Sequence, residues 1–278
     1  MLKVKFWREN RTIEKLFAVG DMNKPSTEYV PMGIREFDRV MDGGMRGGEL
    51  IVISGETGQG KTLFAQTITC NLNKIDIPNL WFSYEMSPYY LKTKFVQMGQ
   101  TLNDPIFSPI ILSNGTIDFI TEEIQEAVDE EGYKVVFIDH LHYLIPLQQS
   151  INASLLIGGI VRELKKIAVK FNIIIILIAH TKKIYQDEEL SLSSVRDSSL
   201  VCQESDYVFL VQRIKVEPPK NKKLDMILKP PTGNEWTNET KINLAKNRRT
   251  GQMIYLDFQY INGVLIPITK IYGNEYTG

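Results

Sequence analysis

The chain has 278 residues and a formal net charge of −1 at pH 7, with 43% hydrophobic and 23% charged residues. This composition is typical of a globular domain with a sizeable core, and it excludes a polybasic chain that binds nucleic acid through its overall charge. The longest apolar run, residues 173–179, is too short to span a membrane, and the N-terminus lacks the apolar stretch of a signal peptide.

The chain begins with polar residues of mixed charge, so we interpret residues 1–30 as an N-terminal arm or linker and residues 31–278 as one domain. Residues 31–45 predict a short helix that is closed by glycines. Apolar strands are then predicted at residues 50–54, 79–84, 135–138, 172–179 and 207–212. Helices are predicted from about residue 61, over residues 116–131 and from residue 152.

The predicted strands alternate with helices and are apolar on both faces, which is typical of an α/β fold with a parallel sheet. The helix from Asn152 is predicted to bury one face, made of Leu155, Leu156, Ile160, Leu164, Ile167 and Phe171. Four prolines and several lysines interrupt the pattern, so residues 213–240 predict a loop or an irregular hairpin. Residues 241–245 and 253–259 predict closing strands.

A glycine-rich loop after the first strand carries the strongest chemical signal. It consists of Gly55, Glu56, Thr57, Gly58, Gln59, Gly60, Lys61 and Thr62, and it matches the P-loop pattern. Its glycines allow a tight turn whose backbone N–H groups surround phosphate oxygens, at the favourable N-terminus of a helix. We expect Lys61 to reach the β and γ phosphates of ATP, and Thr62 to supply a hydroxyl ligand to Mg²⁺.

Acidic residues follow two of the predicted strands. Asp139 follows residues 135–138, where an acid can hold the Mg²⁺ shell through water or merely cap the next turn. Glu85 follows residues 79–84, where a carboxylate beside the P-loop can orient and deprotonate the attacking water. A solvated loop acid is the alternative for Glu85, and Glu56 is a competing candidate for the base that we rank lower.

Histidines follow the same kind of strand. His180 follows residues 172–179, where a polar side chain can contact the γ phosphate and sense its loss, or can be an ordinary loop histidine. His140, His142 and His180 suggest a metal site only weakly, because no cysteine or second cluster of ligands accompanies them.

Basic residues gather toward the C-terminus. Lys246 and Arg248 follow a predicted strand two residues apart, and side chains at that spacing on a strand point to one side. Facing a neighbouring subunit's nucleotide, they would stabilise the charge of phosphoryl transfer, whereas a basic hairpin turn is the plainer alternative. Residues 213–249 hold ten Lys/Arg and four Asp/Glu, which fits a solvated loop or an electrostatic contribution to nucleic-acid binding.

Four segments in chain order resemble DnaB-type replicative helicases. They are GETGQGKT with LWFSYEMS, then VVFIDHLHYL, then SSVRDSSLVCQESDYVFLVQR, then LAKNRRTGQMIYLDF. The resemblance spans residues 31–266 and implies a RecA-like ATPase motor domain. It further implies a ring, usually a hexamer, with ATP and Mg²⁺ between subunits and single-stranded DNA in the central channel.

The resemblance also implies roles for the matching residues of the nucleotide site. Lys61 and Thr62 would bind phosphate and Mg²⁺, and Asp139 would be the acid that holds the metal. Glu85 would be the catalytic base. His180 stands where bacterial members have glutamine and some relatives have histidine.

Other matching residues concern the neighbouring subunit and DNA. Lys246 and Arg248 would act on the adjacent subunit's ATP. Arg196, Asp197 and Ser199 occupy the segment whose family counterparts grip the DNA backbone. The chain departs from the family here, since Asp197 replaces the usual glutamate and Ser199 replaces a glycine.

Two further departures affect partners. The loop after Asp139 is not basic, and residues 1–30 do not match the family's N-terminal helical domain, which joins the ring and meets primase. Those residues are a candidate for a linker helix that docks on the next subunit. This departure fits a minimal helicase, a fragment or a relative with another task. Primase or a helicase loader are the candidate partners, and the expected location is the cytoplasm of a bacterial or phage-infected cell.

Two rival functions share parts of the pattern. A RecA- or RadA-like strand-exchange ATPase would bind DNA as a filament, and a KaiC-like ATPase would act on a protein partner. Residues 32–49 are shared with RadA- and KaiC-type proteins, whereas the FSYEMS and KNRRTG segments favour the helicase. Salt-dependent binding of single-stranded DNA separates the first two functions from the third.

Overall fold

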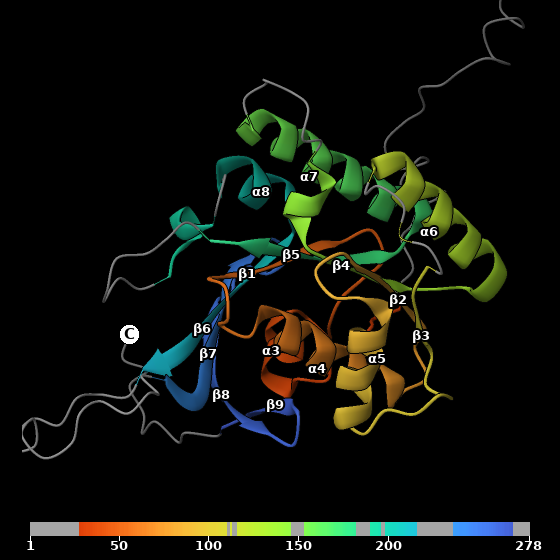
Figure 1. Cartoon of the computed structure of the whole chain (residues 1–278). Coiled ribbons are helices and arrows are strands. Elements are labelled where there is room, and N and C mark those ends of the chain that lie inside the picture. Colours follow the sequence, from red (N-terminus) through yellow and green to blue (C-terminus); the bar gives the residue numbers. More distant parts are fainter. Residues whose placement is uncertain are drawn as a thin grey trace, which may run out of the picture.

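The computed structural model describes residues 28–109, 112, 116–145, 153–181, 190–195, 198–215 and 236–268. Their strands are β1 (Leu50–Gly55), β2 (Asn79–Ser83), β3 (Ile106–Phe107), β4 (Val135–Asp139), β5 (Ile174–His180), β6 (Tyr207–Lys215), β7 (Trp236–Asn247), β8 (Ile254–Ile261) and β9 (Val264–Pro267). They form one sheet in the order β3-β2-β4-β5-β1-β6-β7-β8-β9 (Figure 1). The strands from β3 to β6 in this order are parallel, and β7, β8 and β9 continue the sheet antiparallel.

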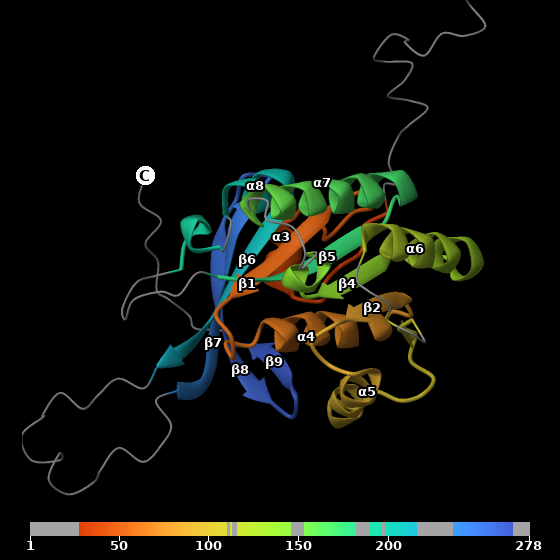
Figure 2. The same cartoon turned by 45° about the horizontal axis from the view of Figure 1, so that its top comes forward.

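Helices cover both faces of the sheet. They are α3 (Arg35–Val40), α4 (Lys61–Asn73), α5 (Pro88–Gln97), α6 (Ile117–Glu131), α7 (Ala153–Phe171) and α8 (Ser198–Glu204), with short 3₁₀ helices η1 (Leu141–Leu144) and η2 (Leu192–Ser194). Figure 1 shows α6, α7 and α8 on one face and α3, α4 and α5 on the other, and Figure 2 shows α4 and α5 across the sheet from α6 and α7. The predicted α/β class and mostly parallel sheet are confirmed.

The central strands are apolar throughout because each side chain meets one of two cores. Along β1, Ile51 and Ile53 pack on the side of α4, while Leu50 and Val52 pack on the side of α7. All four side chains are fully buried. Alternate residues of a strand point to opposite faces, so a sheet covered on both sides requires this unbroken run.

An aromatic cluster of Phe37, Phe64, Phe209 and Phe258 joins α3 and α4 to the sheet. Ring centroids lie 5.1 Å apart for Phe37 and Phe209, and 5.5 Å apart for Phe64 and Phe209. We expect Phe209→Ala to lower the free energy of unfolding by about 3–5 kcal/mol, because it leaves a cavity in a closed core. Urea unfolding measures this, with the exposed Leu102→Ala as control, and equal effects of the two would contradict the expectation.

Several predicted elements change in the structure. The strand predicted from residue 172 begins at Ile174, since Asn172 has a left-handed φ of 51°. Leu155, predicted to be buried, is 63% exposed, because the buried stripe of α7 runs through Ile157 and Val161, and a residue two positions away faces elsewhere. Of the two alternatives for residues 213–240, the described part fits the irregular hairpin: residues 213–215 and 236–240 belong to β6 and β7, which pair antiparallel with a register shift at Arg213, and residues 216–235 lie outside the described residues.

The beginning of the described chain already contacts the domain. Val30 is buried and exchanges two backbone hydrogen bonds with Met45, and Glu28 forms an ion pair with Lys134 at 2.7 Å. Residues 1–27 of the proposed arm lie outside the described residues. Among the described helices, none is long and apolar enough to cross a membrane.

Candidate functional site

The carboxyl ends of the parallel strands meet at one edge of the sheet, and four predicted segments lie there. β1 ends in the P-loop, β2 leads to Glu85, β4 ends at Asp139 and β5 ends at His180. The register pairs Gly55 with His180 and Ser83 with Asp139, so β1 ends level with β5 and β2 ends level with β4. The backbone N–H of Glu85 also donates to the carbonyl of Asp139 at 3.3 Å. Residues distant in sequence therefore converge on one site.

The P-loop presents an open backbone at the start of α4. Gly58 and Gly60 have left-handed φ values of 78° and 98°, which glycine adopts without strain. Gly60 is the N-cap of α4, and no side chain in the described part of the chain caps the first N–H groups of that helix. The side chain of Gln59 anchors the loop by accepting from the backbone N–H of Arg213 at 2.7 Å. An uncapped helix start behind a fixed glycine loop is a ready anion site.

Lys61 begins α4 and points into the site. It is 6% exposed, and its ammonium donates to the carbonyl oxygen of Glu56 at 2.9 Å. Burial lowers the pKa of Lys61. Three carboxylates oppose that shift, in decreasing order Glu85, Asp139 and Glu56. The charge of Glu85 therefore raises the pKa of Lys61 more than the charge of Glu56 does.

Thr62 and Asp139 fit a magnesium ion. The hydroxyl of Thr62 donates to Oδ2 of Asp139 at 2.9 Å, and the Asp139 side chain is fully buried. Oδ1 of Asp139 is also buried and has no hydrogen-bond partner among the described residues. A buried carboxylate oxygen without a donor is costly unless a cation or water satisfies it. A hydroxyl and a carboxylate are hard oxygen ligands of the kind that Mg²⁺ takes.

The burial of Asp139 predicts a pH dependence. Burial raises the pKa of Asp139 to about 6, more than the hydrogen bond from Thr62 lowers it. Below that pH the carboxyl is mostly protonated and loses the charge that attracts Mg²⁺. We expect Mg²⁺-dependent binding of a fluorescent ATP analogue to weaken about tenfold at one pH unit below this pKa, relative to the plateau above it. The Asp139→Asn variant should lack this pH dependence. If the variant showed the same pH profile as the wild type, Asp139 would not be its source.

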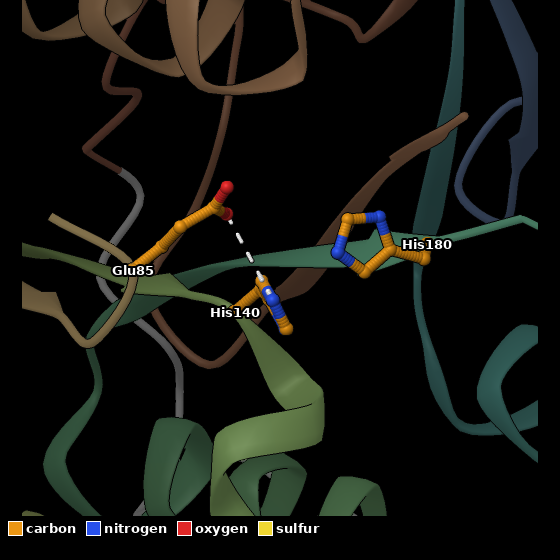
Figure 3. Close-up of side chains that lie close together, drawn as sticks. All are labelled: Glu85, His140 and His180. Carbon is orange, nitrogen blue, oxygen red and sulfur yellow. Dashed lines mark ion pairs between the residues drawn. The ribbon is translucent and has the colours of Figure 1, made fainter. Parts of the chain in front are cut away.

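Two histidines lie beside Glu85 at the same edge (Figure 3). Nε2 of His140 is 3.8 Å from Oε2 of Glu85, and the ring centroids of His140 and His180 are 4.3 Å apart. Burial is the main cause that lowers both imidazole pKa values to about 4; His142 adds to it at His140, and Lys61 at His180. Both rings are therefore neutral at pH 7.

The histidines also bear on the question of a metal. Sequence spacing gave little support for a site made of His140, His142 and His180. Among the described residues, the group whose ligand atoms lie close together is instead Glu85, His140 and His180, all within 4.8 Å of one another. Nδ1 of His180 is buried and has no hydrogen-bond partner among the described residues, so this nitrogen is left for a ligand.

Lys246 and Arg248 lie at the opposite end of the sheet from the P-loop. Asn247, between them, pairs with Tyr207, and Tyr207 pairs with Ile51 near the start of β1. The P-loop follows the other end of β1, a full strand length away. In this chain, the two basic residues are therefore remote from their own P-loop.

Lys246 and Arg248 were expected to point to one side because both would lie on a strand, and this reason is wrong. β7 has a register shift opposite Val208 and Phe209 and ends at Asn247, so Arg248 lies in the following turn. The two side chains nevertheless approach one region. Lys246 donates to the carbonyl of Ser205 at 2.6 Å, and Nη1 of Arg248 lies 3.6 Å from Oδ1 of Asp206.

The residues expected to contact DNA are only partly described. Arg196 and Asp197 lie outside the described residues, and Ser199 lies in α8, where only its backbone is described. Their expected role therefore stays a prediction.

A cavity of about 370 Å³ opens beside the P-loop. Its lining includes Gly58 and Gly60 of the loop together with Arg213 of β6 and Tyr260 of β8. Sequence reasoning assigned no role to Tyr260 and placed Arg213 only in the basic stretch of residues 213–249, because neither residue belongs to a phosphate motif. Arg213 lies on β6, which pairs directly with β1, whereas Tyr260 reaches the P-loop through the antiparallel extension of the sheet, whose strand β9 packs on α4.

These features together define a P-loop ATPase domain of the RecA-like class. The chain belongs to the DnaB-like helicase C-terminal domain family, whose model matches residues 111–264, more than half of the chain. A model described as an AAA domain matches residues 31–185.

The curated relatives include a DnaB helicase and a RadA protein. A "Replicative DNA helicase DnaB" of Mycoplasma pneumoniae is 26% identical over 254 residues, covering 78% of this chain and 52% of the relative. A "DNA repair protein RadA" of Bacillus subtilis is 25% identical over 173 residues, covering 62% and 36%. The chain spans about half the length, or less, of the curated relatives it matches.

Two solved structures share the fold. One, described as an ATPase domain, superposes with a TM-score of 0.72 at 19% identity, covering 91% of this chain and 96% of that one. The other is described as the structure of a DnaB-like replicative helicase and its interactions with primase. It superposes with a TM-score of 0.70 at 20% identity, covering 95% of this chain and 70% of that one.

Proposed function

We propose that this domain is the ATP-driven motor of a DnaB-type DNA helicase, which translocates on single-stranded DNA as a ring, most simply a hexamer. The proposal rests on one observation: within one chain, the phosphate-binding loop is separated from the two basic residues that would act on a nucleotide. The P-loop lies at one end of the strands, and Lys246 and Arg248 lie at the other. Copies arranged head to tail would bring the basic pair of one subunit to the nucleotide of the next.

Each residue of the nucleotide site has a role in this proposal. The backbone of the P-loop, Gly55 to Thr62, would surround the phosphates, and Lys61 would neutralise the β and γ phosphates. Thr62 and Asp139 would hold Mg²⁺, which polarises the phosphates when bound. Glu85 would accept the proton of the attacking water, and His180 would contact the γ phosphate.

The cavity beside the P-loop would receive the nucleoside. It begins at Gly58 and Gly60, where the phosphates would lie, and it is lined further out by Tyr260, which is 50% exposed. An aromatic face and the guanidinium of Arg213 can stack on a planar base. ATP would thus bind with its phosphates on α4 and its base toward β6 and β8.

The first test is ATP hydrolysis with and without single-stranded DNA, on protein sized by light scattering. The helicase proposal expects hydrolysis that DNA stimulates in a ring-sized species, followed by unwinding of a forked duplex. Hydrolysis indifferent to DNA would instead favour an ATPase that acts on a protein partner. Because a structural neighbour is described with primase, primase is a partner to add in the same assay.

A RadA-like DNA strand-exchange ATPase is the second candidate, since a RadA relative matches 62% of the chain. Both candidates require salt-dependent binding of single-stranded DNA. They differ in products, because a helicase separates a forked duplex without a homologous strand. Strand exchange that needs a homologous partner, without unwinding of a fork, would favour the second candidate.

A further inference from the structure

His140 lies between Glu85 and His180 in a position that the proposed mechanism does not yet use (Figure 3). It follows Asp139 directly and is 9% exposed. Its Nε2 is 3.8 Å from Oε2 of Glu85, while the ring of His180 packs against its ring at an interplanar angle of 74°. A buried imidazole facing a carboxylate at the nucleotide site calls for a chemical role.

The hydrogen bond at the other ring nitrogen identifies the proton position. His140 is the N-cap of η1, and its Nδ1 accepts from the backbone N–H of His142 at 3.3 Å. A nitrogen that accepts a hydrogen bond carries a lone pair and no proton, so the imidazole of His140 carries its proton on Nε2. The group that faces Glu85 is therefore an N–H donor.

This proton position argues against a metal held by Glu85, His140 and His180. A histidine that ligates a metal through one nitrogen donates the proton of its other nitrogen to an acceptor. At His140 the other nitrogen meets a donor, the N–H of His142. Nε2 therefore has no lone pair for a metal unless that cap is broken.

The ring of His140 is held firmly, whereas its partner is not. Tyr143 lies 4.8 Å from it between ring centroids, and Leu141 and Leu144 bury η1 in the core. The side chain of Glu85 is 44% exposed. A half-exposed glutamate retains several rotamers, and a fixed donor can select one of them.

We propose that His140 is a positioning residue for Glu85, whose carboxylate it orients toward the phosphate site through its Nε2–H. The inference rests on the proposed function, in which Glu85 accepts a proton from the attacking water. A distance of 3.8 Å is longer than a hydrogen bond, and such contacts often tighten only when the substrate binds. The fixed imidazole of His140 and the mobile carboxylate of Glu85 then act as one unit.

The kinetic test compares two substitutions of His140. His140→Phe keeps a ring of similar size and removes the donor, and His140→Gln places an N–H near the position of Nε2. We expect kcat of the Phe variant to fall about 10–100-fold with KM for ATP unchanged, and the Gln variant to keep most of kcat. In a Glu85→Gln background the Phe substitution should add almost nothing, since the two residues act together.

Three kinetic outcomes would overturn the proposal. They are an unchanged kcat in the Phe variant, equal losses in the Phe and Gln variants, or independent effects of the His140 and Glu85 substitutions. Thermal melting of each variant shows whether a loss of rate is a loss of folding.

A second measurement does not depend on hydrolysis. The chain has three histidines, so ¹⁵N NMR of the imidazoles can be assigned with single substitutions. We expect His140 to carry its proton on Nε2 and its ring nitrogen shifts to change in Glu85→Gln. A proton on Nδ1, or 1:1 binding of zinc chloride that is lost in His140→Phe, would overturn the proposal in favour of a metal. Absence of ATP hydrolysis in the wild type would refute the proposed function alone, and the NMR result would still decide the role of His140.

Discussion

Replacing Lys61 with alanine should abolish ATP hydrolysis, with a loss of at least about 10³-fold in kcat. Lys61 lies at the N-terminus of α4 with its ammonium 2.9 Å from the carbonyl of Glu56, at the mouth of the loop that would surround the phosphates. Its charge acts where negative charge accumulates during phosphoryl transfer, and the residue is 6% exposed. Steady-state phosphate release at saturating ATP measures the effect.

The control for this substitution is on the same helix. Lys74 is the exposed C-cap of α4, and Lys74→Ala removes a positive charge without reaching the site. Burial already lowers the pKa of Lys61, so removing its charge relieves a desolvation cost and should not unfold the domain. If Lys61→Ala retained most of the wild-type rate, the assignment of the P-loop would be wrong.

The central sheet was predictable because its strands are buried on both faces. A strand such as β5 appears in the sequence as a continuous apolar run, and a glycine-rich loop after β1 identifies the edge at which chemistry occurs. Elements with weaker patterns were not predicted. α5 buries only Leu91 and Phe95, and β3 has two residues, so neither leaves a clear periodicity.

The site was predictable where a residue follows a strand and not where strand order brings residues together. Glu85, Asp139 and His180 were each identified from the strand that precedes them. The proximity of Glu85 and His180 to His140 follows from the order β2-β4-β5, which single-sequence patterns do not specify. The role of Tyr260 was harder to predict, because this residue lies on β8, which is distant from the P-loop in the sequence.

The second large effect concerns Arg248. We expect Arg248→Ala to lose hydrolysis by about 10³–10⁵-fold, the range for an arginine that stabilises phosphoryl transfer, while the affinity for ATP is kept. The guanidinium is 63% exposed and lies 3.6 Å from Asp206, at the end of the sheet remote from its own P-loop. It therefore cannot serve the nucleotide of its own chain. Arg162→Ala is a matched control, since its guanidinium is 58% exposed and pairs with Glu204.

Mixing variants tests whether Arg248 acts between subunits. Arg248→Ala subunits retain Glu85, and Glu85→Gln subunits retain Arg248, so some interfaces of a mixed ring combine an intact base with an intact arginine. Hydrolysis should then recover in part, although each variant alone is inactive. A chain that carries both substitutions should give no recovery when mixed with Glu85→Gln, because every interface lacks the base. If the first mixture recovered no more hydrolysis than this control, Arg248 would act within one chain, and the head-to-tail arrangement would have to be abandoned.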